Sequence, residues 1–247
     1  MKSNTIAVAV LLLALLAPAG RSQTGPCATL VGPLVPDLAI DVKAFQQSIK
    51  VSRQYLSGPD IAEGYIQQAG WYTLLRFGTV TANIGTGDLL IGDPSLCPNL
   101  YEPSPTYGWR ASHPTLFRLW TPAGYNKWAA ARDLNQPIDA PYNQTLLDNA
   151  KASGELVATG FKKWSCLVSE YTYCNNVKKV QWACGYQLLR ACYSDEYDAG
   201  IAGQYIIMTG VPKGVYTVEQ HIDPWLLFPD LDRRNNVAAV SFSFAGK

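Results

Sequence analysis

The carboxy-terminal stretch, residues 204–244, constrains the fold more than any other part of the chain. It holds three short segments that are rich in β-branched and aromatic residues or alternate apolar with polar ones: QYIIMTG (204–210), GVYTVEQHID (214–223) and NVAAVSFSF (236–244). Two turn-forming sequences separate them, Pro212-Lys213-Gly214 and Asp230-Leu231-Asp232. Short strands joined by tight turns are typical of an antiparallel sheet or sandwich, and we expect one here.

The rest of the chain extends this pattern. GWYTLLRFGTVTANIG (70–85) is also strand-like and ends at the turn Gly85-Thr86-Gly87-Asp88. Helical periodicity is limited to patches at 40–56 and 153–164. Proline, glycine and asparagine recur between residues 92 and 145, which predicts long ordered loops. We therefore expect a mainly β fold, a β-sandwich with long loops and a few short helices.

The amino terminus has the form of a secretory signal peptide. A single lysine precedes an apolar run that ends in Ala17-Pro18-Ala19, the small-x-small pattern of a cleavage site. The apolar run is short for a membrane span, so we expect no stable membrane anchor. The prediction is a signal peptide over residues 1–19, ending between 19 and 24, followed by a single domain over 25–247 in a secreted protein.

Charge excludes one class of partner. The formal net charge is +1, and the lysines and arginines are scattered along the chain. A protein that binds nucleic acid or an anionic membrane gathers basic residues into a patch. We therefore expect no nucleic-acid partner.

The cysteines predict disulfide bonds. All six (Cys27, Cys97, Cys166, Cys174, Cys184 and Cys192) follow the signal sequence. An even number in an oxidising compartment indicates up to three bonds, although spacing alone does not select among the possible pairings. A zinc site is disfavoured, because no close CxxC pair occurs and histidine is nearly absent.

One N-glycosylation sequon occurs, Asn143-Gln144-Thr145. It lies in PIDAPYNQTLL, which has the composition of an exposed loop, so Asn143 is a candidate glycosylation site.

The sequence gives little support for a hydrolytic enzyme. The chain has two histidines, His113 and His221, which leaves few options for a Ser-His or Cys-His pair. The neighbouring acids Asp195 and Glu196, or Asp230 and Asp232, are glycosidase candidates in principle. Acids in loops more often cap turns or form ion pairs, and we expect that role here.

Several motifs occur together in an order that resembles one family. Val35-Pro36-Asp37-Leu38 comes first, followed by LLRF and the Asn83-x-Gly85-Thr86-x-Asp88-Leu89 turn; Asp223-Pro224 and FPDLDRRNNV (228–237) come last. Their order and spacing resemble the catalytic domain of the lysyl oxidases, secreted copper- and quinone-dependent amine oxidases that deaminate peptidyl lysine. The resemblance runs from about Pro36 to Phe244 and implies a lysyl-oxidase-like β fold.

The resemblance assigns two positions for the quinone cofactor. In the family, a lysine and a tyrosine are cross-linked into lysyl tyrosylquinone. The lysine lies four residues before a cysteine, as Lys162 does before Cys166 in GFKKWSC. Six residues separate the tyrosine from a strand that begins with glutamine and an aromatic residue, and six residues likewise separate Tyr197 from Gln204. Tyr197 is one residue farther from Cys192 than the family pattern has it, yet it fits better than Tyr193.

The copper site of the family does not match. The family binds copper with three histidines in a W-x-x-C-H-x-H-x-H segment, and here that segment is WRASHPTLF (109–117). His113 takes the first ligand position, whereas Thr115 and Phe117 take the second and third. Two histidines cannot make a three-histidine site, so His113 is interpreted as a remnant, and without copper the quinone is not expected to form.

The resemblance also bears on the disulfides. Cys166 and Cys174 resemble a short-loop pair of the family, lengthened by two residues. Ser112 and Gly203 stand where the family has partners for Cys184 and Cys192. These two cysteines are left to pair with each other or with Cys97 and Cys27.

The first functional hypothesis is a secreted lysyl-oxidase-like protein without a cofactor. It would act non-catalytically, binding an extracellular protein or polysaccharide or serving as a structural subunit of extracellular matrix, cell wall or a surface assembly. The alternative is an active protein-lysine 6-oxidase with copper, lysyl tyrosylquinone and an atypical metal site built on His113 and His221. A second alternative is a carbohydrate-binding module that uses exposed tryptophans such as Trp120 and Trp128.

Overall fold

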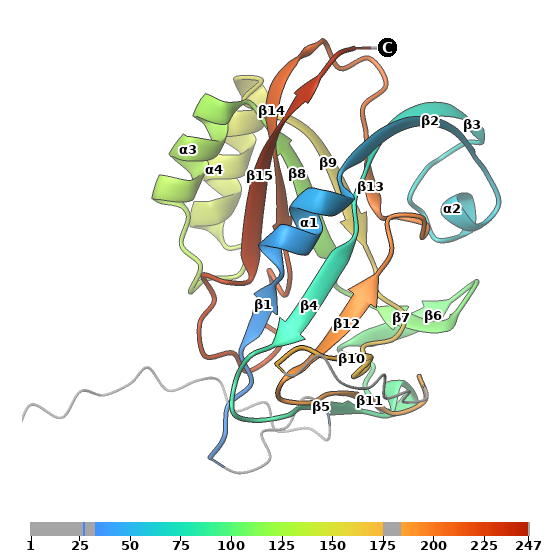
Figure 1. Ribbon diagram of the computed structural model, residues 1–247, viewed down its shortest axis with the longest axis vertical. Helices are drawn as coiled ribbons and strands as arrows, with labels where there is room; N and C mark the ends of the chain where they lie inside the picture. The colour runs from blue at the N-terminus through green and yellow to red at the C-terminus, as the bar shows by residue number, and fades with distance from the viewer. Residues whose placement is uncertain (1–26, 28–32, 175–183, 247) are drawn as a thin grey trace, which may run out of the picture.

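Three antiparallel sheets organise the molecule around one core (Figure 1). The computed structural model describes residue 27, residues 33–174 and residues 184–246, so the expected signal peptide lies outside the described residues. The first sheet has the order β15-β14-β8-β9 and consists of β8 (Thr115–Trp120), β9 (Leu156–Lys162), β14 (Gly214–His221) and β15 (Val237–Phe244). The prediction of a mainly β fold is confirmed.

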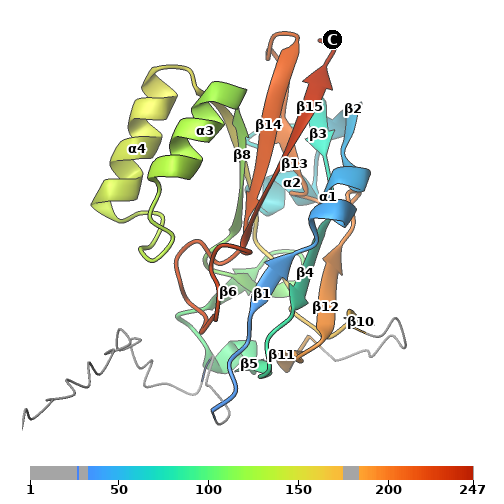
Figure 2. The same cartoon turned by 60° about the vertical axis from the view of Figure 1, so that its left-hand side comes forward.

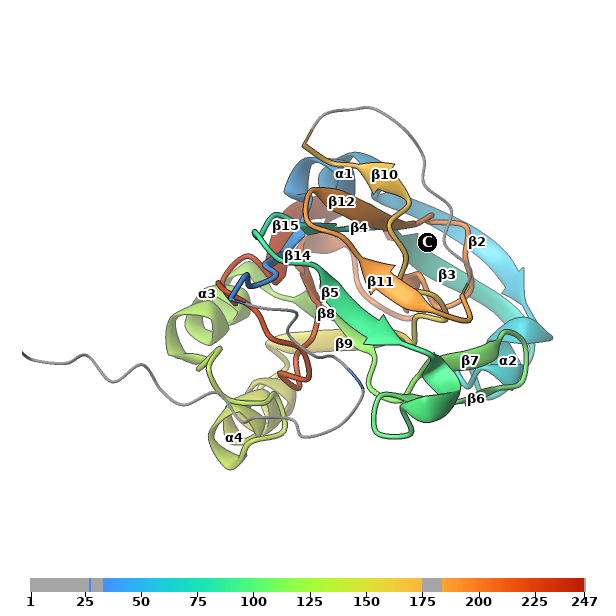
Figure 3. The same cartoon turned by 90° about the horizontal axis from the view of Figure 1, so that it is seen from below.

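Two further sheets complete the core. One has the order β1-β4-β12-β10 and consists of β1 (Leu38–Ile40), β4 (Thr79–Asn83), β10 (Tyr171–Thr172) and β12 (Tyr193–Tyr197). The other has the order β13-β3-β2 and consists of β2 (Lys50–Leu56), β3 (Gly70–Arg76) and β13 (Tyr205–Ile207). Two small ribbons lie at the lower end of the molecule in Figure 1, the end from which Figure 3 is seen: β5 (Leu89–Gly92) with β11 (Gln187–Leu189), and β6 (Tyr101–Ser104) with β7 (Gly108–Ala111).

Two helices cover the outer face of the first sheet (Figure 2). They are α3 (Pro122–Ala131) and α4 (Pro141–Ala152), which pack with Trp120 and Trp128 in a separate apolar cluster. The other helices are short: α1 (Val42–Ser48), α2 (Pro59–Ala62) and a 3-10 turn, η1 (Pro94–Leu96). Within the described residues, no helix is long and apolar enough to cross a membrane.

Alternation along β8 separates two environments. Thr115 and Phe117 face inward, and the ring of Phe117 packs edge-on against Phe77 at 4.8 Å. Arg118 and Trp120 face the helices, where both donate to the fully buried carboxylate of Glu219. Successive side chains of a strand point to opposite faces, so the first sheet divides an inner cavity from a charged layer beneath α3.

Three local predictions from the sequence are wrong. The segment 153–164 forms β9 rather than a helix, and the helix expected over 40–56 ends at Ser48, where β2 takes over. The loops expected between 92 and 145 include β6 to β8 and two helices. Pro122 and Pro141 lie in the first turn of those helices, where a backbone N–H has no partner within the helix, so proline fits there. These prolines therefore mark helix starts rather than loops.

The tryptophan and asparagine predictions are corrected as well. Trp120 and Trp128 are buried, and their indole N–H groups donate to Glu219, so neither offers a surface on which a sugar could stack. Asn143 lies in α4 with 2% of its surface exposed. Its amide nitrogen, the atom that would carry a glycan, donates to the carbonyl of Asp133 at 2.9 Å. The exposed-loop prediction for Asn143 is therefore wrong.

All six cysteines form disulfides, as predicted, but the pairing differs. The bonds join Cys27 to Cys97, Cys166 to Cys184 and Cys174 to Cys192. The expected Cys166–Cys174 bond is wrong, as are the pairings left open for Cys184 and Cys192. Strand β10 pairs with β12, and the N–H of Tyr173 donates to the carbonyl of Cys192 at 2.7 Å; this holds Cys174 beside Cys192 and away from Cys166.

Candidate functional site

Lys162 and Tyr197, the two positions singled out from the sequence, lie together. Each is the last residue of a strand, Lys162 of β9 and Tyr197 of β12. The Lys162 ammonium nitrogen lies 5.7 Å from the centre of the Tyr197 ring. It also lies 5.2 Å from the ring centre of Tyr65 and 5.6 Å from that of Tyr107. Three tyrosine rings thus surround one buried amine.

The environment of Lys162 favours its neutral form. The side chain is 3% exposed, and its Nζ donates one hydrogen bond to the carbonyl of Ala202 at 2.8 Å. Desolvation lowers the pKa of Lys162 from 10.5 to about 8, although the negative charges of Glu63 and Asp60 act in the opposite direction. A substantial fraction of this amine is therefore unprotonated at mildly alkaline pH.

The phenol of Tyr197 is held in its neutral form. Its hydroxyl donates to the carbonyl of Cys166 at 2.7 Å and accepts from the N–H of the same residue at 3.2 Å. Desolvation raises the pKa of Tyr197 well above its usual value, and the nearby charge of Asp195 adds to the effect. Phenolate formation is thus disfavoured.

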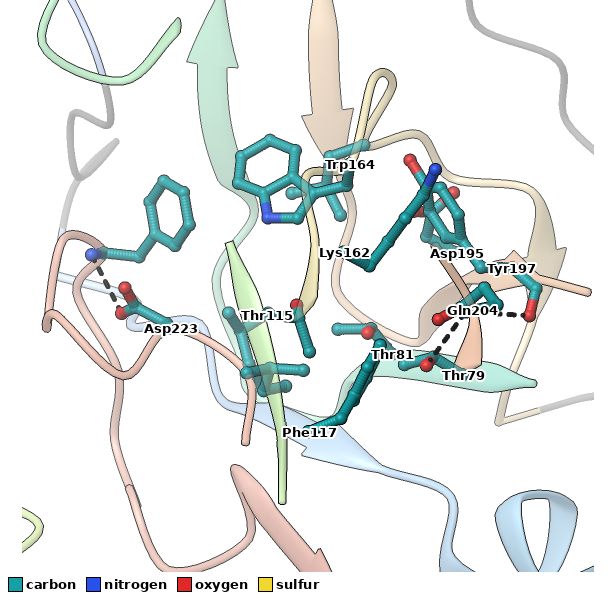
Figure 4. A pocket seen from close by; sticks show the side chains of 14 residues that line it. Thr79, Thr81, Thr115, Phe117, Lys162, Trp164, Asp195, Tyr197, Gln204 and Asp223 are labelled. Carbon is teal, nitrogen blue, oxygen red and sulfur yellow. Dashed lines mark hydrogen bonds between the residues drawn. The ribbon is translucent and has the colours of Figure 1, made fainter. Parts of the chain in front are cut away.

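A cavity joins these groups (Figure 4). About 480 Å³ of space free of protein atoms, part of it open to solvent, is lined mainly by apolar side chains and threonines. Thr115 and Phe117 line it together with Lys162 and Tyr197. The inward-facing positions of β8, where the resemblance places the second and third copper ligands, therefore meet the two quinone positions around one space.

Two polar residues of the cavity were not identified as site residues from the sequence. Gln204 is fully buried, and its Nε2 donates to Thr79 Oγ1 at 3.1 Å and to the carbonyl of Tyr197 at 3.2 Å. Its Oε1 is buried and has no hydrogen-bond partner among the described residues. The prediction that Asp195 and Glu196 are loop acids is wrong, because both lie in β12. Asp195 is 3% exposed, and desolvation raises its pKa well above the usual value. Their cavity position depends on the pairing of distant strands, which no local motif encodes.

The other acids weighed from the sequence act locally. Asp232 accepts from the backbone N–H of Arg234 and forms an ion pair with its guanidinium at 2.7 Å. Asp230 accepts from the N–H of Asp232 and from the side-chain amide of Asn236. The prediction that this pair caps turns and forms ion pairs is confirmed. Asp223 has a similar role, since its carboxylate accepts from two backbone N–H groups and from Arg233 at 2.8 Å.

The residues at the copper positions do not fit copper. Thr115 and Phe117 offer a hydroxyl and a hydrocarbon ring, whereas imidazole is the side chain that suits this metal. His113 lies outside the cavity lining, where its Nδ1 is 3.0 Å from Ser112 Oγ and its ring packs against Trp225. No cluster of three or more His, Cys, Asp or Glu side chains able to hold a metal ion occurs among the described residues.

His221 is on the opposite side of the first sheet from the cavity. Its Nδ1 lies 2.9 Å from Arg118 Nη2, in the charged layer with Glu219. Desolvation lowers the pKa of His221 well below its usual value, and the positive charges of Arg118, Arg132 and Arg233 lower it further. The same positive charges oppose the binding of a metal cation at this imidazole.

Comparisons with known proteins point to the family that the motifs resemble. The lysyl oxidase family model matches residues 127–247, a segment that contains Lys162 and Tyr197 and begins after His113. The chain is 28% identical over 225 residues to lysyl oxidase homolog 1 of Homo sapiens, in an alignment that covers 86% of this chain and 34% of that protein. It is 29% identical over 176 residues to protein-lysine 6-oxidase of Gallus gallus, covering 70% of this chain and 34% of that protein. The chain thus spans about a third of the length of these relatives.

Proposed function

We propose that the chain is a distant member of the lysyl oxidase family and that it works without the copper chemistry of that family. In this proposal it is a secreted protein that acts non-catalytically. It binds an extracellular protein or polysaccharide, or serves as a structural component of extracellular matrix, cell wall or a surface assembly. Lys162 and Tyr197 remain ordinary side chains.

The observation that carries the proposal is the donor set around the cavity. The inward-facing residues of β8 at the metal positions are Thr115 and Phe117, and neither histidine lines the cavity. A metal-free site leaves Tyr197 without an oxidant, and its pKa is raised well above the usual value, so the phenolate, the more easily oxidised form, is scarce. No step of amine oxidation is therefore assigned to these residues.

The well-packed core supports a binding or structural role, which depends on the folded domain. Three disulfides, a continuous apolar core and the buried Glu219 layer all stabilise the domain independently of any metal. Disulfides of this kind are typical of extracellular proteins and support secretion.

One observation favours the alternative, an active protein-lysine 6-oxidase. The 5.7 Å between the Lys162 nitrogen and the Tyr197 ring is a short distance for two residues that the family joins covalently. This alternative needs a metal ligand set outside the cavity lining. The copper-binding experiment described next therefore distinguishes an active oxidase from a non-catalytic protein.

Copper binding separates the two functions. Mature protein expressed with added copper is dialysed against a weak chelator and its metal content measured, and hydrogen peroxide release is followed with alkylamine substrates. The proposal predicts far less than one copper per chain and no peroxide above the level of a no-protein blank. One retained copper per chain together with peroxide release would refute it.

A matched variant tests whether the cavity is the lost copper site. The double change Thr115→His and Phe117→His places imidazoles at both inward-facing positions of β8, two and four residues after His113. We expect this variant to retain more copper than the wild type. Thr115→Ser with Phe117→Leu is the control, because it alters the same positions without adding a metal ligand. Circular dichroism of both variants shows whether the fold survives.

A further inference from the structure

The cavity contains a buried amine and an unpaired acceptor, and neither has a task in a purely structural protein. Lys162 places its amine against three tyrosine rings and makes one hydrogen bond, to the carbonyl of Ala202. Gln204 Oε1 is buried with no partner among the described residues. A buried acceptor left unpaired is unfavourable, so a ligand that donates a hydrogen bond there would remove that penalty.

The amine is suited to react with a carbonyl group. A lysine desolvated in an apolar pocket is a stronger nucleophile at neutral pH than an exposed one, because more of it is unprotonated. Desolvation lowers the pKa of Lys162 to about 8. Phe117, Leu167 and Ile222 give the cavity an apolar wall.

We propose that Lys162 binds a small hydroxyaldehyde covalently as an imine, with the ligand's hydroxyl donating to Gln204 Oε1. The proposal rests on the proposed function, because it requires that Lys162 is not joined to Tyr197. The neutral amine nitrogen attacks the carbonyl carbon to give a carbinolamine. Loss of the carbinolamine hydroxyl, with a proton, as water then forms the C=N bond. No oxidant or reductant takes part, and the bond reverses by hydrolysis.

Both parts of the ligand follow from the cavity. The aldehyde is needed for the imine, and the hydroxyl is needed for the unpaired amide oxygen. The Gln204 side chain is held in place by its bonds to Thr79 and to the Tyr197 carbonyl, so its free oxygen is fixed among the cavity residues (Figure 4).

The experiment is competitive labelling of the full mature protein with glycolaldehyde. Cyanoborohydride traps each imine as a stable secondary amine, and peptide mass spectrometry gives the labelling rate of every lysine. Lys151 and Lys213 are exposed and serve as internal references. At pH 7.5 we expect Lys162 to be labelled at least about tenfold faster than either, since an ordinary lysine with a pKa of about 10.4 is almost wholly protonated. Labelling of Lys162 no faster than the references would overturn the proposal.

The hydroxyl contact has its own control. Propanal has the aldehyde but no hydroxyl, so the ratio of glycolaldehyde to propanal labelling at Lys162 reports on Gln204. We expect this ratio to exceed that at Lys151 and to fall to that level in Gln204→Leu, while propanal labelling of Lys162 persists. Propanal labelling also shows that the variant keeps the cavity. A ratio unchanged by Gln204→Leu would overturn the assigned hydrogen bond.

Failure of this inference is distinguishable from failure of the proposed function. The untreated protein is digested alongside, and the peptides that contain Lys162 and Tyr197 are located. If they are covalently joined, both proposals fail. If they are separate and Lys162 remains unlabelled, only the imine proposal fails.

Discussion

Replacing Lys162 with methionine should change how stability depends on pH. Methionine has a similar length and no charge, so the variant removes the ammonium group from the cavity while largely keeping the packing. Lys162 is almost fully buried, and its pKa falls from 10.5 to about 8. At about 1.36 kcal/mol for each tenfold change in proton affinity, the protonated form costs the folded state roughly 3 kcal/mol.

The direction of the effect follows from proton binding. Below pH 8 both the folded and the unfolded chain carry the proton, and the full cost is present. Between about pH 8 and 10.5 the unfolded chain holds the proton more often than the folded chain, so the free energy of unfolding rises with pH. Between pH 7 and pH 10 this gain is about 2.5 kcal/mol for the wild type and absent from Lys162→Met.

The assay is urea unfolding of both proteins at several pH values, with disulfides intact. The quantity of interest is the difference in unfolding free energy between them, because tyrosines and other groups titrate in both and cancel. Lys151→Met, at an exposed position, is the control and should show no such trend. A difference between wild type and Lys162→Met that stays constant from pH 7 to pH 10 would contradict the lowered pKa of Lys162; a Lys162 joined to Tyr197 would give that result.

Three further predictions concern the fold. Glu219→Gln should destabilise the domain by about 3–5 kcal/mol in thermal or urea unfolding, since it leaves the buried Arg118 uncompensated; a loss below 1 kcal/mol would contradict the network. Treatment of the secreted protein with an endoglycosidase should leave its mass unchanged, because the Asn143 amide is buried and hydrogen bonded; a mass loss that disappears in Asn143→Gln would contradict this. Non-reducing peptide mapping should recover Cys174 joined to Cys192; a peptide joining Cys174 to Cys166 would overturn the assigned pairing.

The strands were predictable where local pattern and tertiary environment agree. β15 alternates in sequence, and its side chains Ala238, Val240 and Phe244 lie on the core, so there the pattern reports burial. β14 is buried on both faces, because Glu219 and His221 lie in the charged layer beneath α3. β9 was mistaken for a helix because its spacing also fits a helical period. The pairing of β9 with β8, which joins segments distant in the sequence, makes it a strand. The close approach of Gly160 to the carbonyl oxygen of Tyr205 is likewise visible only in the tertiary structure.

The candidate site was predictable in part. Lys162 and Tyr197 were found from their offsets to a cysteine and a strand, and the structure places them side by side. The roles of Gln204 and Asp195 depend on which strands become neighbours, information that no short segment carries. The disulfide pairing failed for the same reason, since strand pairing holds Cys174 beside Cys192.

The most direct test of the central claim is peptide mass spectrometry of the mature protein expressed with added copper. We expect the peptides containing Lys162 and Tyr197 to be recovered separately and unmodified, because Thr115 and Phe117 cannot supply the ligands for the metal that would oxidise the tyrosine. A covalently joined Lys162–Tyr197 peptide would overturn the proposed function and establish that the chain builds its own quinone.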